Sequence, residues 1–158
     1  MLVSAAVFRT PSMRERACRT RYPLTDMLWN ILAVLIGLAA GMAVNMALIL
    51  LNSKVLYPAP EGLDFKDKEG FQAYVDTLPA PAFLVVMAAH LGQAFVGGLV
   101  AAWLCESHPV PLALVIGGVS LLGGVMMMRT VKGPKWMLIE LPLYLVLAYV
   151  AAVIAGPA

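Results

Sequence analysis

The chain has 158 residues, of which 61% are hydrophobic and only 13% are charged. Water-soluble domains carry about 25% charged residues, so this composition excludes an ordinary soluble domain and predicts a membrane protein. The formal net charge of +2 is too small to indicate a nucleic-acid partner. The two cysteines, Cys18 and Cys105, follow no spacing typical of a metal site or a disulfide framework.

Residues 1–26 form a polar N-terminal arm that is rich in arginine. The hydrophobic part of a signal peptide runs for about 7–15 residues, whereas the uncharged run that follows the arm extends from Met27 to Leu51. We therefore expect an uncleaved signal anchor. Two alternatives stay open: an organelle transit peptide, and an upstream extension of a protein that begins at Met27. The arginines of the arm are Arg9, Arg14, Arg16, Arg19 and Arg21.

The run 27–51 is long enough to cross a bilayer, since about 20 apolar residues span the hydrocarbon core. Small residues recur along it every fourth position, at Ala33, Gly37 and Gly41, and the stripe ends at Asn45. Gly37 and Gly41 form a G-x-x-x-G pair, which lets a second helix approach closely. We expect this stripe to pack against another helix of the same chain.

The loop 52–81 is the only long polar segment after the arm. Asp64 and Asp67 form a capping-box-like pair, which predicts a helix that begins after Asp64. The apolar residues that follow at helical spacing are Phe71, Tyr74, Val75 and Leu78. This pattern predicts a short amphipathic helix that lies on the membrane surface.

Three further hydrophobic runs predict spans over 82–104, 110–128 and 136–155. Together with the first run they predict an all-α, integral membrane four-helix bundle over residues 27–158. The second and third spans are joined by a very short link and should form an antiparallel hairpin. Small residues on their faces, Gly97, Gly117 and Gly124, should mediate helix packing as Gly37 and Gly41 do.

The polar side chains of three spans are expected at similar depths in the membrane. The loop 52–81 and the loop before span four must lie on one side, because the chain crosses the membrane twice between them. Counted from that side at about 1.5 Å per residue, Asn45, His90 and Glu140 each lie about 7–12 Å deep. Gln93 and Tyr144 lie one turn deeper than His90 and Glu140. The candidate polar pocket is therefore Asn45, His90, Gln93, Glu140 and Tyr144.

Two interpretations of these polar residues are open. In the first, Glu140 and His90 form a pair that binds a proton or a ligand. In the second, which we favour, Glu140 complements the helix dipole and pairs with Lys135 or Arg129, and the other polar residues are interhelical hydrogen-bonding groups. No nucleophile elbow, H-E-x-x-H pair or phosphate loop occurs. We expect no catalytic residue, cofactor or metal.

Two segments, GLAAGMAVNMALILLN followed by YPAPEGLD and LPAPAFLVVMAAHLGQAFVGGLVAA, resemble a group of uncharacterised small four-span bacterial membrane proteins. The fourth span shares the likeness through Trp136, Glu140 and the pair Leu143-Tyr144. It covers most of the chain from Met27 onward but not the arginine arm. The resemblance implies a four-span fold, brings no catalytic role, and suggests that the arm is an extension.

We consider two main hypotheses for the function of this membrane protein. The first hypothesis is a small structural or accessory membrane protein without catalytic activity, which packs through glycine-rich faces as a homo-oligomer or beside a larger membrane partner. The second is a small transporter or channel with a half-buried polar pocket and proton coupling through Glu140 and His90. An intramembrane enzyme is the least supported reading. We expect the bilayer of a bacterial inner membrane, with the N-terminus cytoplasmic because the arginines directly precede span one.

Overall fold

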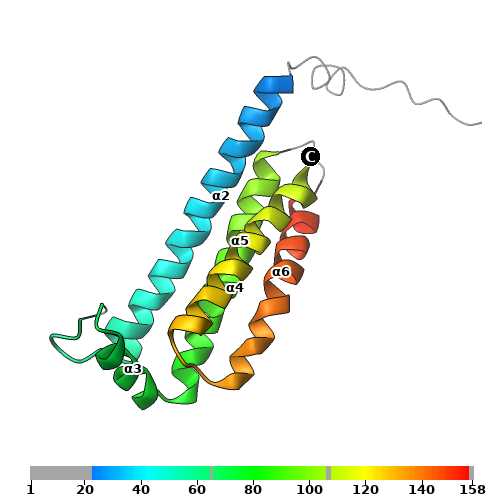
Figure 1. Ribbon diagram of the computed structural model, residues 1–158. Helices are drawn as coiled ribbons and strands as arrows, with labels where there is room; N and C mark the ends of the chain where they lie inside the picture. Colours follow the sequence, from blue (N-terminus) through cyan, green and yellow to red (C-terminus); the bar gives the residue numbers. More distant parts are fainter. Residues whose placement is uncertain (1–22, 65, 106–107, 157–158) are drawn as a thin grey trace, which may run out of the picture.

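The computed structural model describes residues 23–64, 66–105 and 108–156. Residues 1–22 of the arginine-rich arm lie outside this range, whereas its last four residues, 23–26, are described and belong to the first helix. The helices are α2 (Pro23–Leu51), α3 (Lys68–Thr77), α4 (Ala80–Leu104), α5 (Pro109–Thr130) and α6 (Glu140–Ala155), with a π-helix, η1 (Asn52–Leu56), after α2 and a 3₁₀-helix, η2 (Lys135–Ile139), before α6. Four helical segments of the described residues are long and apolar enough to cross a membrane. They form the expected bundle (Figure 1), which confirms the all-α four-span fold.

The first span is longer than its hydrophobic run. Within the described residues its helix already includes residues 23–26, which we expected to belong to the arm. It then continues through η1 to Leu56, so residues 52–56 are helical and not loop as we expected. Asn52 is 5% exposed and donates a hydrogen bond from Nδ2 to the carbonyl of Ala82, at 3.2 Å. This contact with α4 holds the extra turn in the bundle.

Helix α4 is the central element, because it packs against α2, α5 and α6. Helix α2 packs almost wholly along α4, through its glycine stripe. A methyl group on Gly37 would lie 2.6 Å from the carbonyl oxygen of Gly97, and one on Gly41 would overlap the carbonyl oxygen of Gln93. The two backbones therefore touch, and only glycine fits at these positions.

The opposite end of the α2–α4 contact is held by polar side chains of α2. Trp29 donates a hydrogen bond from Nε1 to the carbonyl of Leu104, at 2.9 Å. This carbonyl is in the last turn of α4, where no intrahelical donor remains for it. The thiol of Cys105 donates to the side-chain oxygen of Asn30, at 3.0 Å. Helix α2 thus caps the C-terminal end of α4.

We expect Trp29→Phe to lower the free energy of unfolding by about 1 kcal/mol, because it removes this hydrogen bond but keeps an aromatic side chain at the position. The measurement is denaturant unfolding in detergent micelles, followed by circular dichroism. Trp103→Phe is the matched control, since Trp103 is 72% exposed and makes no hydrogen bond to any described residue. Equal losses in the two variants would contradict the cap.

The surface helix α3 forms, but one turn later than the sequence indicates. Asp67 is its N-cap, with an extended backbone and a side chain that accepts from the backbone N–H of Glu69. Asp64, which we expected to be the cap, instead accepts from the backbone N–H of Lys66 in the preceding turn, at 2.9 Å. Either aspartate can cap a helix; the fold of the loop before it decides which one does.

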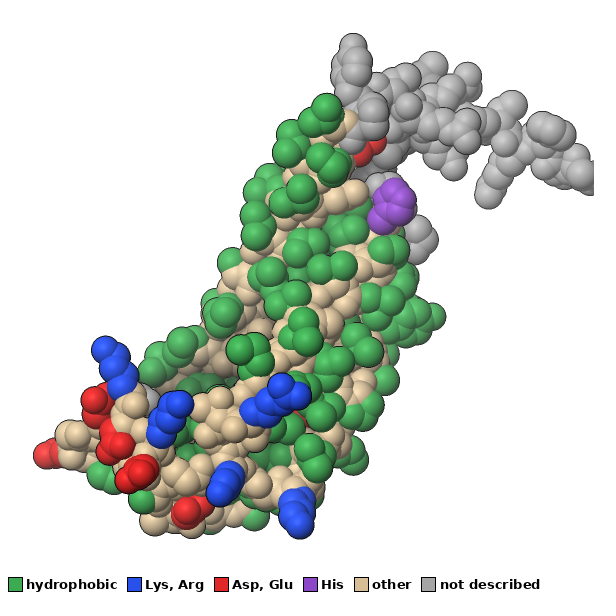
Figure 2. Space-filling view, viewed as in Figure 1, with side chains coloured by type: hydrophobic (Ala, Val, Ile, Leu, Met, Phe, Trp, Pro, Cys, Tyr) green, Lys and Arg blue, Asp and Glu red, His purple; other side chains and the backbone are tan. Residues whose placement is uncertain are grey.

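Helix α3 lies where the α2–α3 and α5–α6 loops meet, at one end of the bundle (Figure 1). The Gln72 amide donates to the carbonyl of Lys132 at 3.0 Å and accepts from its N–H at 2.8 Å. Tyr74 donates to the carbonyl of Tyr57, and burial raises the pKa of the Tyr74 hydroxyl. Charged side chains gather at this end (Figure 2). Both loops thus lie at the same end of the bundle, as the two spans between them require.

Candidate functional site

The central feature of the candidate site is an acid–imidazole pair between α4 and α6. The Nδ1 atom of His90 lies 3.3 Å from Oε1 and 3.4 Å from Oε2 of Glu140. The side chain of Glu140 is 1% exposed and that of His90 is 17% exposed. Ionisable groups at such depth are costly unless they are paired, and this pair joins two different spans.

The local sequence of α6 explains where Glu140 sits. Pro142 has no N–H and cannot bond to the carbonyl of Leu138, so the regular helix starts only at Glu140 and the preceding residues wind as the 3₁₀-helix η2. Glu140 is therefore in the first turn of α6, where a negative charge complements the helix dipole. That part of our favoured interpretation agrees with the structure.

The prediction that Glu140 pairs with Lys135 or Arg129 is wrong. Lys135 and Arg129 are both exposed, and neither forms an ion pair with Glu140. Among the described residues, the basic side chain within salt-bridge distance of Glu140 is His90, whose ring is charged only when it is protonated. The reason is rotational: η2 and the start of α6 turn the carboxylate toward the bundle interior and leave the two basic side chains outside.

Tyr144 completes the environment of the carboxylate. It lies one turn after Glu140 and donates a hydrogen bond from its hydroxyl to Oε1, at 3.2 Å. Its side chain is almost fully buried, at 1% exposure. Gly124 of α5 provides the space, since a methyl group there would lie 2.8 Å from the Tyr144 hydroxyl. The phenol is thus fixed between α5 and α6.

A second polar contact connects α4 to α5. Gln93 lies one turn after His90, and its Nε2 is 3.5 Å from the hydroxyl of Ser120, which is 4% exposed. Ser120 therefore belongs to this cluster, although the candidate pocket did not include it. In the sequence, a serine among glycines indicates a small residue used for helix packing. Only the position of Ser120 at the level of Gln93 could have indicated the contact between them.

Four of the five residues of the candidate pocket make these contacts, and Asn45 does not. Asn45 of α2 is half-buried, and no hydrogen bond joins it to His90, Glu140 or any other residue in the described ranges. Matching depth was the basis for including it. Asn45 continues the stripe of Gly37 and Gly41, which contacts α4. Equal height and a shared face therefore do not by themselves bring its amide within hydrogen-bonding distance of the pair.

The glycines of the bundle divide into inward and outward positions. A methyl group on Gly97 would lie 3.0 Å from Ile116, and one on Gly117 would lie 2.8 Å from the Cβ atom of Ala148. Gly37, Gly41 and Gly124 make the equally close approaches described above. Around Gly118 and Gly123 of α5, in contrast, a methyl group would meet nothing within 4 Å.

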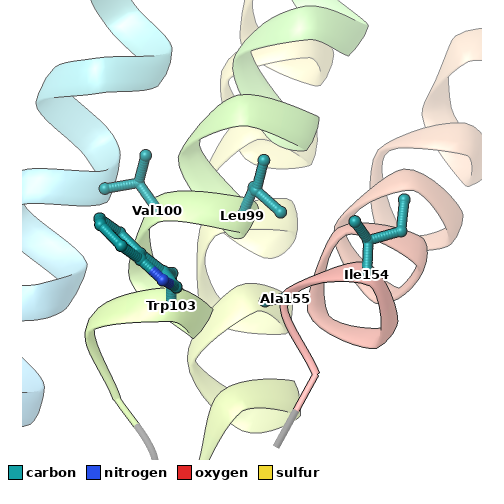
Figure 3. A pocket seen from close by; sticks show the side chains of 5 residues that line it. All are labelled: Leu99, Val100, Trp103, Ile154 and Ala155. Carbon is teal, nitrogen blue, oxygen red and sulfur yellow. The ribbon is translucent and has the colours of Figure 1, made fainter. Parts of the chain in front are cut away.

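An apolar groove lies between α4 and α6, toward the end of the bundle where α6 ends (Figure 3). Its volume is about 390 Å³. The side chains that line it are Leu99, Val100, Trp103, Ile154 and Ala155. None carries a charge, and Leu99 is about 13 Å along α4 from His90 at the usual helix rise. The groove is therefore separate from the polar cluster.

The fold and these contacts define a four-span membrane protein with a buried acid–imidazole pair in its interior. No group of three histidine, cysteine or acidic side chains able to hold a metal occurs among the described residues. The chain matches no protein-family model, no curated protein and no solved structure. Its function is therefore argued from the geometry alone.

Proposed function

We propose that the protein is a small accessory membrane protein without catalytic chemistry, which packs against another membrane helix. The contacts inside the bundle support this role. His90, Glu140 and Tyr144 are bonded to one another, and Gln93 reaches Ser120. Such contacts connect α4, α5 and α6 into one unit, as interhelical hydrogen bonds do in membrane proteins. A stable unit of this kind can present an outer surface to a partner.

The observation that carries the proposal is the outer face of α5. We use this name for Val115, Gly118, Val119, Leu122, Gly123 and Met126, which lie on one side of the helix by their spacing. Leu122 and Met126 are 65% and 68% exposed, and the two glycines have open space beside them. The opposite side of the same helix uses Gly117 and Gly124 to contact α6. Small residues allow close approach of a second helix, so the outer face can bind one.

The partner on this face is a second copy of the chain or a larger membrane protein. Single-cysteine crosslinking tests the proposal, in a background where Cys18 and Cys105 are replaced by serine. Leu122→Cys probes the centre of the outer face, and Val153→Cys, at a position 58% exposed on α6, is the matched control. We expect several-fold more crosslinked product from Leu122→Cys in native membranes. Equal yields would show that the outer face of α5 contacts lipid only.

A second variant separates docking from folding. Gly118→Leu adds bulk in open space, so it should leave the unfolding of the bundle unchanged. In the Leu122→Cys background it should reduce the crosslinked product at least several-fold, because the partner helix can no longer approach. Undiminished crosslinking in the Gly118→Leu variant would count against a docked helix on this face.

We further propose that the protein resides in a bacterial inner membrane with its N-terminus on the cytoplasmic side. The arginines ahead of α2 favour this orientation. The end that carries α3 then faces away from the cytoplasm. In the background without the native cysteines, Glu61→Cys, in the exposed α2–α3 loop, should react with a membrane-impermeant thiol reagent added outside intact cells. Protection of that cysteine until the cells are opened would reverse the orientation.

A further inference from the structure

We propose that His90, Glu140 and Tyr144 form a proton-binding site inside the bundle, in which one proton of the His90 imidazole is exchangeable and Glu140 holds the ring in place. The inference rests on the contacts of three side chains from two spans. It concerns the interior of the bundle and does not depend on a partner at the outer face of α5.

The hydrogen bonds identify the exchangeable position. When Glu140 is ionised, its carboxylate only accepts hydrogen bonds, and the Nδ1 atom of His90 then carries the hydrogen that points at it. Tyr144 supplies a second donor to Oε1. The other ring nitrogen, Nε2, has no hydrogen-bond partner among the described residues, and the imidazole is 17% exposed. Nε2 is therefore the atom that gains or loses a proton.

The net charge of the site explains why the binding of this proton should affect helix packing. With Nε2 unprotonated, the ionised Glu140 and the neutral imidazole carry a net charge of −1. Adding one proton from solution to Nε2 forms the N–H bond and turns the site into a neutral ion pair. A net charge inside an apolar bundle is much more costly than a neutral pair. Proton binding should therefore favour the packing of α4 on α6, and proton release should weaken it.

No other charge in the surrounding helices can take the place of that proton. Within α4, His90 is the only ionisable residue, and the stretch 27–51 of α2 has none. Arg129 of α5 and Lys135 of η2 are exposed, and neither pairs with Glu140. Tyr149 of α6 is 50% exposed and makes no hydrogen bond to the cluster in the described residues. The imidazole is thus the only cation source in contact with the carboxylate.

The chain offers an internal reference for a direct test, because its only histidines are His90 and the exposed His108. The experiment is an NMR titration of the imidazole nitrogens in ¹⁵N-histidine-labelled protein in lipid nanodiscs, with His108→Gln used for assignment. We expect Glu140→Gln to move the pH midpoint of His90 by about one unit or more, which is a tenfold change in proton affinity. The midpoint of His108 should stay unchanged.

Tyr144→Phe provides a second variant that keeps both ionisable groups. It removes one hydrogen bond to the carboxylate, so it should move the His90 midpoint by a smaller amount. Identical His90 midpoints in the wild type and Glu140→Gln would overturn the proposal. Should Glu140→Gln not fold, Tyr144→Phe decides in the same way. Crosslinking at Leu122 is not involved in this measurement, so the proton site and the accessory function can fail separately.

Discussion

Gly41→Ala is expected to lower the free energy of unfolding by about 1–3 kcal/mol, although it adds only one methyl group. The added Cβ atom would overlap the backbone carbonyl oxygen of Gln93. A backbone atom cannot move aside as a flexible side chain can, so α2 must shift away from α4. That shift also strains the hydrogen bonds at the two ends of the helix pair, from Trp29 and Asn52.

Gly118→Ala is the matched control for this prediction. It makes the same change in a membrane-spanning helix, at a glycine with nothing within 4 Å of the new methyl group. Alanine is a better helix former than glycine, so this variant should be neutral or more stable by about 0.5–1 kcal/mol. Unfolding by denaturant in mixed micelles, followed by circular dichroism, measures both. Equal stability of the two variants would mean that α2 and α4 do not touch as described.

His90→Leu is expected to have the largest effect, a loss of about 3–5 kcal/mol of unfolding free energy. It leaves the carboxylate of Glu140, which is 1% exposed, with Tyr144 as its only side-chain hydrogen-bond donor among the described residues. An uncompensated charge of this kind is the usual cause of large losses when one partner of a buried pair is removed. His108→Leu, at the exposed histidine before α5, should be close to neutral.

Adding Glu140→Leu to that variant should restore most of the loss. Two leucines replace the pair by apolar groups, and buried pairs exchanged for packed hydrophobic residues are often neutral in stability. The double variant should therefore unfold within about 1 kcal/mol of the wild type, and the effects of the single variants should be strongly non-additive. If the losses of unfolding free energy in the single variants His90→Leu and Glu140→Leu simply add in the double variant, His90 and Glu140 do not act as a pair.

The sequence predicted the depth of the polar residues better than their direction. His90 and Glu140 were placed at one level by counting residues from a shared membrane face, and in the structure they are hydrogen-bonded. Asn45 was placed at that level by the same count, yet it forms no hydrogen bond with the pair in the described residues. The rise of a helix is constant, so height follows from residue number. The rotation of each helix about its axis depends on what it packs against.

Rotation also decided which glycines face inward. Gly117 and Gly118 are neighbours in sequence, as are Gly123 and Gly124, but only Gly117 and Gly124 contact α6. The loop 52–81 shows a similar limit, since Asp64 and Asp67 are equally good capping residues and the structure uses Asp67. In each case two residues of one type compete, and contacts with distant segments choose between them.

By itself, the sequence determined that this is an all-α membrane protein with four spans, because a run of about 20 apolar residues must form a helix to satisfy its backbone in lipid. It also predicted that His90 and Glu140 lie at the same level of the bundle. Only the tertiary structure decided that Glu140 pairs with His90 instead of Lys135 or Arg129, and that one side of α5 stays open. Span formation depends on contiguous residues, whereas side-chain partners depend on how helices far apart in the chain turn toward one another.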